Sequence, residues 1–352
     1  MRYVWSVVFI SIVFAFGVSA SSARWEELAP PVIDGIWVRP VQSEPAQPVW
    51  GHAAGLRIGL WPMPGPRGLL RVYAPYLGHS EGRMINYIAV EPIVRGDSYR
   101  GLSEMEGSDL DGVQGKRFWS GDSPEDRIPR DPTCPAAGVT GQEGGVESLT
   151  VYIFVEPFEN GAAVYLRLTF RSDRPYEVGI ATFAAPDAAP LDYCIVTATM
   201  GNYARLRKIY LTDRVVSSLA LWPGYRGLGF TDRVEFPLQD LPRSPDGAAL
   251  FIAAPDEEHP EAAQYAPHTF IGWRYYGDVA TQYWRCEDTS DDLVGAVNGR
   301  YVYWNSESPI PGGVAIENFE LIRPFAQGTE YWFGVTPKPP ESLLNRKPLL
   351  GG

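Results

Sequence analysis

One predicted hairpin constrains the fold of this chain more than any other stretch. Residues 149–156, Leu-Thr-Val-Tyr-Ile-Phe-Val-Glu, are rich in the β-branched and aromatic side chains that favour strands. Asn160-Gly161 follows, and Asn-Gly is the preferred pair for a tight two-residue hairpin turn. The return strand alternates cleanly, with one face formed by Val164, Leu166, Leu168 and Phe170. The stretch therefore predicts two antiparallel strands that share an apolar face.

Short strand-like runs recur along the chain, and most of them are bounded by Gly, Pro, Asp or Asn. A helical period is hard to find, because Pro and Gly interrupt nearly every window. This pattern predicts an all-β protein, a large antiparallel β-sandwich with little helix. Further strands are expected at residues 176–183, 193–200, 204–211, 215–222, 249–254, 269–276, 300–304, 314–322 and 331–336.

The length leaves two domain organisations open. An ordinary sandwich uses about 100 residues, so 352 residues would form two sandwiches or one enlarged one. Leu60-Trp61-Pro62 recurs as Leu221-Trp222-Pro223. The recurrence indicates either two related halves of the chain or simply the residue composition that is common in turns. Because no Ser- or Gly-rich linker separates the halves, we expect one large domain at residues 49–340. An extended Pro-rich segment, residues 21–48, would precede it, and a tail, residues 341–352, would follow it.

The first 20 residues have the layout of a secretory signal peptide. Arg2 precedes an apolar run from Tyr3 to Val18, and small residues follow that run. The run is shorter than the ~20 residues of a spanning helix, which favours cleavage over an uncleaved membrane anchor. We expect an exported protein, periplasmic or extracellular, with no membrane insertion after cleavage.

The three cysteines are Cys134, Cys194 and Cys286. In an oxidising compartment this odd count leaves open one disulfide with a leftover thiol, or three buried thiols. The spacing contains no C-x-x-C pair, which disfavours structural zinc.

The formal net charge of −12 restricts the partners of the protein. Nucleic acids and anionic membrane surfaces attract proteins through a positive field, so neither is an expected general partner. The sequence does not indicate an oligomeric state.

Residues 83–119 combine an apolar strand with a polar loop. The strand, residues 83–94, carries Glu91, and the loop carries Glu104, Glu106 and Trp119. A rigid strand that leads into a polar loop is a common way to build a site in β-proteins.

Glu317 lies in an otherwise apolar stretch, where burial would raise its pKa and suit it to acid–base chemistry. Simple alternation would place Glu317 on one face with Phe319 and put Asn318 on the other. We take Glu91, Glu104, Glu106 and Glu317 as acid/base candidates, although a Glu in such a setting more commonly binds an arginine.

Two local motifs in this region have simpler explanations. Gly78-His79-Ser80-Glu81-Gly82 matches a hydrolase nucleophile elbow, but a strand follows the serine where a helix is required. His79 stays a weaker acid/base candidate. Asp109 and Asp111 suggest a calcium loop, but the EF-hand spacing fails. We expect no cofactor and no metal ligands, with a looser calcium site as the alternative.

The clearest basic cluster contains Arg205 and Arg207, which alternation places on one face of a strand. Paired guanidinium groups can hold a carboxylate or sulfate bidentately, and internal salt bridges are the alternative. In a sugar site Arg67 would add a third cation, Asn202 a hydrogen bond and Trp119 a stacking surface.

No motif matches a known family. In class alone the chain resembles large secreted β-sandwich proteins that handle polysaccharides, including the mutarotase-like supersandwich of some lyases and epimerases. The resemblance implies a carbohydrate-interacting protein, acting as a lyase, epimerase or hydrolase on an anionic glycan. The alternative is a non-catalytic exported binding or structural protein of the cell envelope. An enzyme requires at least two of the carboxylate or histidine groups to converge in one cleft.

Overall fold

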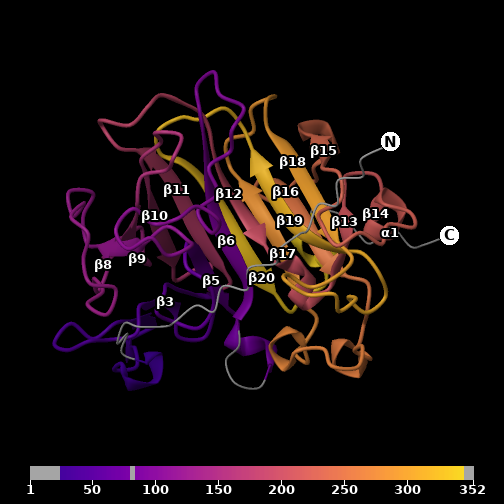
Figure 1. Ribbon diagram of the computed structural model, residues 1–352, viewed down its shortest axis with the longest axis horizontal. Coiled ribbons are helices and arrows are strands. Elements are labelled where there is room, and N and C mark those ends of the chain that lie inside the picture. Colours follow the sequence, from indigo (N-terminus) through magenta and orange to yellow (C-terminus); the bar gives the residue numbers. More distant parts are fainter. Residues whose placement is uncertain (1–23, 80–83, 345–352) are drawn as a thin grey trace, which may run out of the picture.

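Two large antiparallel sheets packed face to face form the protein (Figure 1). The computed structural model describes residues 24–79 and 84–344. The only α-helix in these ranges is the single turn α1 (Ser218–Leu221). The predicted all-β sandwich with little helix is therefore confirmed. The predicted signal peptide, Ser80 and the end of the C-terminal tail lie outside the described residues.

The first sheet has ten strands in the order β1-β2-β3-β4-β5-β6-β12-β19-β18-β15. Its strands in chain order are β1 (Val32–Asp34), β2 (Trp37–Arg39), β3 (Val49–His52), β4 (Arg57–Gly59), β5 (Leu69–Tyr73), β6 (Met84–Val94), β12 (Leu191–Thr199), β15 (Val234–Pro237), β18 (Val294–Arg300) and β19 (Ala315–Ile322).

The second sheet runs in the order β14-β13-β16-β17-β20-β11-β10-β9-β7, and β8 also pairs with β9. Its strands are β7 (Phe118–Gly121), β8 (Val139–Glu143), β9 (Val146–Val155), β10 (Val164–Arg171), β11 (Glu177–Ala184), β13 (Leu206–Tyr210), β14 (Val215–Ser217), β16 (Ala249–Pro255), β17 (Thr281–Cys286) and β20 (Thr329–Thr336).

Short 3-10 helices connect several of these strands. They are η1 (Trp25–Glu27), η2 (Pro75–Leu77), η3 (Gly201–Ala204), η4 (Leu238–Asp240), η5 (Pro260–Ala262), η6 (Ile271–Trp273) and η7 (Pro340–Leu343). No helix in residues 24–79 and 84–344 is long and apolar enough to cross a membrane.

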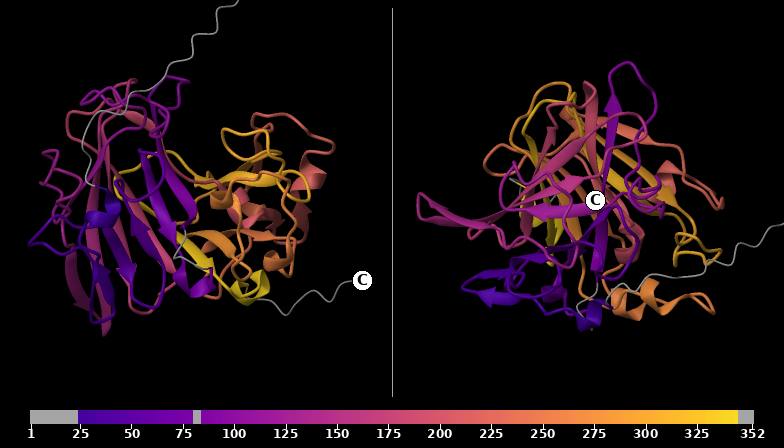
Figure 2. Two further views of the ribbon diagram at one scale, coloured as in Figure 1. Left: turned by 60° about the horizontal axis from the view of Figure 1, so that its bottom comes forward. Right: turned by 60° about the vertical axis from the view of Figure 1, so that its left-hand side comes forward.

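One apolar core lies between the sheets and draws on residues from Trp37 to Val335. Two hydrogen bonds cross it: Trp284 Nε1 donates to the Phe319 carbonyl at 2.9 Å, and Asn86 Nδ2 donates to Gln282 Oε1 at 2.6 Å. The N-terminal half occupies one end of both sheets and the C-terminal half the other (Figure 2). The expected single domain is compatible with this shared core.

The predicted hairpin is present as β9 and β10, with Leu166 opposite Ile153. The alternating face of β10 is fully buried, as expected. The connection is longer than a two-residue turn, because the strands end at Val155 and resume at Val164. Asn160-Gly161 makes a turn within that loop, where the Asn160 side chain accepts a hydrogen bond from the Ala162 amide at 3.0 Å.

Three stretches differ from the expected strands. Residues 269–276 contain η6 in place of a strand, and the Tyr265 hydroxyl bonds both the amide and the carbonyl of Tyr275, which are therefore not available to a neighbouring strand. Residues 215–222 give only the short β14, after which the Ser217 hydroxyl caps α1. The expected strand at residues 300–304 overlaps only the last residue of β18.

The segment at residues 21–48, expected to be extended, contains two short strands of the first sheet. It contributes β1 and β2, which are hydrogen-bonded to the sheet through β3. The three cysteines are all free, with Cys194 and Cys286 buried and Cys134 exposed. Neither the disulfide nor the set of three buried thiols is therefore observed.

Candidate functional site

A groove lies on the outer face of the first sheet, the face turned away from the second sheet. Ile88 and Val90 of β6 point into the core, and Glu91 beside them lines the groove. Two adjacent cavities form the groove. The first cavity measures about 350 Å³ and the second about 260 Å³. They share the wall residues Glu104, Met105, Phe230, Trp304 and Asn318.

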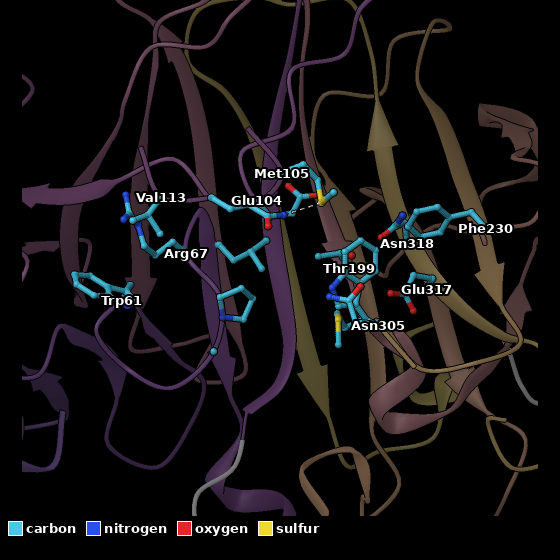
Figure 3. Close-up of a pocket in the computed structure, with 16 residues that line it drawn as sticks. Trp61, Arg67, Glu104, Met105, Val113, Thr199, Phe230, Asn305, Glu317 and Asn318 are labelled. Atoms are coloured by element: carbon cyan, nitrogen blue, oxygen red, sulfur yellow. Dashed lines mark hydrogen bonds between the residues drawn. The ribbon is translucent and has the colours of Figure 1, made fainter. Parts of the chain in front are cut away.

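The first cavity is framed by loops that are far apart in sequence. Trp61 and Arg67 come from the loop before β5, and Glu104 and Val113 come from the loop after β6. On the other side lie Phe230, Asn305, Glu317 and Asn318, with Thr199 of β12 nearer the centre (Figure 3). The sheet thus supplies a rigid floor, and the loops supply the walls.

A register slip in β19 brings Glu317 and Asn318 to the same cavity. Asn298 of β18 lies opposite Asn318, but the next residue, Gly299, lies opposite Ile316, so Glu317 is the extra residue. The expectation of simple alternation is therefore wrong here: Phe319 enters the core, and both Glu317 and Asn318 line the first cavity. Bulges of this kind re-aim side chains and are common beside active sites.

An arginine organises the aromatic part of the groove wall. The Arg300 guanidinium carbon lies 5.0 Å from the ring centroids of both Phe230 and Trp304. Arg300 Nη2 also donates to the Leu228 carbonyl at 2.8 Å, which ties the Phe230 loop to β18. These contacts give the groove a fixed apolar surface, of the kind that packs against the CH face of a sugar.

Glu317 forms the deepest acidic group of the first cavity. Its side chain is 1% exposed, so only a ligand group that fills the bottom of the cavity reaches it. Asn202 donates to Oε2, whereas Oε1 is buried and has no hydrogen-bond partner in the described residues. Burial raises the pKa of Glu317 to about 8, and the charge of Arg300 opposes this shift. Glu317 is thus mostly protonated at neutral pH and can donate a hydrogen bond.

Glu104 lies in the wall between the two cavities and has different surroundings. Burial raises the pKa of Glu104, while its own backbone amide, the charge of Arg100 and a hydrogen bond from Ser103 act in the opposite direction. Its Oε2 has no hydrogen-bond partner in the part of the chain that the structure describes. Glu104 and Glu317 are therefore two carboxyl groups of one cavity whose environments differ.

Glu91 belongs to the second cavity, where it forms part of an ion-pair network. Arg100 pairs with Glu91 and, at 2.9 Å, with Glu320. Arg233 contacts Glu320 from the other side at 3.3 Å. Burial raises the pKa of Glu91; Arg100 opposes the shift, and Glu104 and Glu320 add to it.

Glu106 does not line either cavity, although it lies two residues from Glu104. Its Oε2 lies 3.3 Å from Lys116 Nζ, and the lysine is fully buried. The same carboxylate accepts hydrogen bonds from the amides of Glu159 and Leu102. Glu106 therefore holds the loop that presents Glu104, and the geometry assigns it no acid/base role.

Two predicted binding residues contact the groove in other ways than expected. Arg67 lines the first cavity but is paired with Asp111 at 2.8 Å. Burial acts to raise the pKa of Asp111, but hydrogen bonds from Arg67 and the Val113 amide outweigh it and lower the pKa. Asn202 lies behind Glu317 and orients it. In the suggested calcium loop Asp111 is paired with Arg67, and no group of three or more possible metal ligands gathers in the described residues.

His79 and Trp119 lie away from the groove. His79 Nε2 is 3.2 Å from the Arg274 carbonyl oxygen, and its ring contacts Tyr275 at a centroid distance of 5.0 Å. Trp119 belongs to β7 of the second sheet, where it stacks on Phe154 at 5.9 Å.

Arg205 and Arg207 follow the internal salt-bridge alternative. Arg205 Nη1 lies 2.7 Å from Glu257, and Arg207 Nη1 lies 2.9 Å from Asp256, with both arginines almost completely buried. Arg207 also donates to the carbonyls of Pro311 and Val314. Their guanidinium groups are thus engaged within the protein.

Replacing either Arg205 or Arg207 by alanine is expected to lower the free energy of unfolding by at least about 2 kcal/mol, since each change leaves buried acceptors without a donor. Chemical denaturation would measure this loss. The control is Arg214→Ala, which removes surface ion pairs with Asp213 and Asp240 and should change stability far less. Loss of glycan binding in a stably folded Arg207→Ala protein would contradict the structural role.

Strained backbone is concentrated at the groove. Among described residues, only Met200, Arg205, His268 and Asn305 combine a side chain with positive φ. Met200 (φ 74°) and Asn305 (φ 50°) both line the first cavity. Such conformations cluster at binding and active sites, where surrounding contacts maintain them.

Sequence reasoning missed several groove residues, above all Phe230, Arg100, Arg233 and Glu320. Phe230, Arg100 and Arg233 lie in loops, whereas Glu320 lies within β19, and the fold alone brings them together. The sequence signal for Trp304 is the aromatic run at residues 301–304, which is flanked by Arg300 and Asn305.

The fold and the groove together define a class: a large all-β sandwich with a polar, aromatic-lined cleft on one outer face. No protein-family model matches the chain, and no curated protein matches it. Among solved structures it is similar to a candidate mutarotase (YeaD) from Salmonella typhimurium, with 9% identity, a TM-score of 0.24 and coverage of 88% of this chain and 96% of that chain. A likeness of this extent carries no argument about chemistry, which rests on the groove itself.

Proposed function

We propose that the protein is an exported carbohydrate-binding β-sandwich and that its ligand lies in the outer groove. The observation that carries this proposal is the composition of one cavity of about 350 Å³. Rings of Trp61, Phe230 and Trp304 share it with the amides of Asn305 and Asn318 and with two carboxyl groups. Rings pack against sugar CH groups, and planar polar groups bond sugar hydroxyls, so this combination suits a sugar better than a purely apolar ligand.

The charges of the groove favour a neutral sugar over the anionic glycan suggested by the sequence. Arg205 and Arg207, the expected ligands for an anion, are engaged in internal ion pairs. Arg67 is paired with Asp111, and Arg100 is shared by Glu91 and Glu320. Arg233 is likewise paired with Glu235 and Glu320. A uronate or sulfate would therefore have to compete with an internal carboxylate for each guanidinium that lines the groove.

Catalysis is the second candidate function, and the convergence of Glu104 and Glu317 favours it. Two carboxyl groups in different environments can divide the roles of acid and base. In glycoside hydrolysis one carboxyl protonates the leaving oxygen while the other takes a proton from the attacking water. Glu104 and Glu317 are the pair that we assign to such a reaction, or to the acid–base steps of an epimerase.

Export is the part of the proposal that rests on the sequence alone. The support for it is the charged, apolar and small-residue order of residues 1–20. N-terminal sequencing of protein recovered from the medium or periplasm of an expressing cell would test it.

Trp304→Ala is expected to weaken glycan binding about tenfold, because it removes one of the two rings that both cavities share; tenfold corresponds to about 1.4 kcal/mol. The measurement is co-sedimentation and calorimetric titration of the mature protein with a panel of neutral and anionic polysaccharides. Trp25→Ala, which changes an exposed tryptophan outside the groove, is the matched control.

The same incubations separate binding from catalysis. New reducing ends that disappear in Glu104→Gln would establish a hydrolase, and unsaturated-uronate absorbance would point to a lyase. Binding without turnover would leave a carbohydrate-binding protein. If no polysaccharide binds, the proposed function is wrong.

A further inference from the structure

The second cavity continues the first along the outer face of the sheet. Its own lining adds Glu91 from β6, Asn298 from β18 and Glu320 from β19, together with Arg100 and Arg233 from loops. Each cavity alone is at or below the lower end of the range for small-ligand pockets, about 300–1,000 Å³. The groove as a whole is therefore built for something longer than one small ring.

The two cavities differ in chemistry. The first is lined by three aromatic residues and by the side-chain amides of Gln114, Asn305 and Asn318, whereas the second is dominated by ion pairs. In the second, Arg100 and Arg233 hold Glu320 between them at 2.9 and 3.3 Å. Carboxylate oxygens accept hydrogen bonds and guanidinium groups donate them, so neighbouring hydroxyls of one sugar can find both kinds of partner. Because the opposite charges are paired, a neutral polyol fits this surface better than an anion.

The wall between the cavities carries unsatisfied polar atoms. Glu104 Oε2 and Asn318 Oδ1 are both buried, and neither has a hydrogen-bond partner in the described residues. Buried polar atoms without partners are rare in folded proteins, and an unseen partner is one explanation for them. Here both atoms belong to residues that border both cavities, where a linkage between two sugars would pass.

We infer that the groove takes a neutral glycan of at least two linked sugars, one in each cavity, with the linkage beside Glu104 and Asn318. This inference rests on the proposed function and adds to it the length and charge of the ligand. Where turnover occurs, it places the cleaved linkage at Glu104.

Calorimetric titration with glucose and with gluco-oligosaccharides of two to four units, in β-1,4 and α-1,4 linkage, tests the inference. Affinity is expected to rise at least about tenfold from one unit to two and to change little beyond three, because further units leave the two cavities. Oligogalacturonates of the same lengths, which differ in charge, should bind more weakly.

Two variants assign the sugars to the cavities. Arg233→Ala removes a half-exposed side chain of the second cavity while Glu320 keeps Arg100, so the fold should survive. The Arg233→Ala variant is expected to bind one sugar unit and two linked units with equal affinity. Trp61→Ala, in the first cavity only, should weaken binding at every length.

The outcomes separate the two proposals. Equal affinity for one unit and two, or tighter binding of the galacturonates, would overturn the two-cavity assignment while leaving a carbohydrate site. An equal loss at every length in Arg233→Ala would also overturn it. If other polysaccharides bind but no gluco-oligosaccharide shows a length dependence, the two-sugar groove is rejected. Absence of any glycan binding would reject the proposed function itself.

Discussion

Replacing Glu106 by alanine is expected to lower the free energy of unfolding by about 3–5 kcal/mol. The change would leave the ammonium group of Lys116 buried without its counter-charge, since Glu106 Oε2 is the carboxylate found 3.3 Å away. It would also remove the acceptor for the amides of Glu159 and Leu102. Denaturant unfolding monitored by tryptophan fluorescence measures the difference.

Two further variants separate the buried charge from the mere loss of a side chain. Glu159→Ala removes an exposed glutamate from the same corner of the fold and should change stability by less than about 0.5 kcal/mol. Glu106→Gln combined with Lys116→Met replaces the ion pair by neutral groups and should recover much of the loss. A stability loss for Glu106→Ala no larger than that of Glu159→Ala would mean that the pair does not hold the loop.

The contact between Glu106 and Lys116 matters for the groove because it lies in the loop that carries Glu104. The Gly115 amide donates to the Glu106 carbonyl and the Lys116 amide to the Ser103 carbonyl, so the loop closes on both sides of Glu104. Glu156 adds acceptors for the amides of Leu110 and Arg117. Two carboxylates thus fix the backbone of a loop whose third carboxylate, Glu104, is presented to the cleft.

Sequence could place these glutamates in one loop but could not assign their roles. Glu104 and Glu106 are the same residue type two positions apart, and the difference between them is the lysine that reaches only Glu106. Such a partner depends on the tertiary path of the loop, which strand patterns do not encode. The same limit applied to Arg205 and Arg207, whose carboxylate partners lie about 50 residues further along the chain.

The strands were more predictable than the loops. Clean alternation identified β10 because one of its faces is buried throughout, whereas residues 269–276 are rich in aromatic side chains but have no sheet to bury them. Phe270 and Ile271 are consequently more than half exposed. Alternation also failed at Glu317, because a one-residue slip reverses the faces and only the pairing of β18 with β19 reveals it.

Replacing Glu317 by glutamine is expected to stabilise the fold above pH 8 by an amount on the order of several kcal/mol, and to change it little near pH 5. The folded-state pKa of Glu317, about 8, lies above the ordinary value of 4.5. A raised pKa gives a stability contribution that is complete below about pH 4.5 and is lost as the pH rises through 8. Glutamine cannot ionise, so the variant lacks this loss. Free energies of unfolding measured from pH 5 to 9 for both proteins provide the comparison.

The control is Glu177→Gln, which changes another buried glutamate on the opposite sheet. Glu177 accepts a hydrogen bond from the Tyr283 hydroxyl at 2.8 Å and lies 3.9 Å from Arg174, so its charge has partners that Glu317 lacks. A smaller stabilisation at high pH is expected for it, with glycan binding unchanged. If the free energies of unfolding of the wild type and Glu317→Gln depend on pH in the same way, Glu317 ionises as readily in the folded protein as in the unfolded chain.

A stabilising Glu317→Gln change would indicate that the carboxyl group at this position serves a role other than stability. An unpaired buried carboxyl weakens the fold at alkaline pH, and an amide of nearly the same shape would not. In wild-type protein, glycan affinity should fall as the pH rises through 8, because the ionised group can no longer donate its hydrogen bond. In Glu317→Gln that fall should be absent, and any turnover should drop by about 10²–10⁴-fold. Greater stability together with lost turnover is the expected behaviour of a group that serves the ligand rather than the fold. Turnover equal to wild type would remove Glu317 from the chemistry and leave Glu104 as the carboxyl of the cleft.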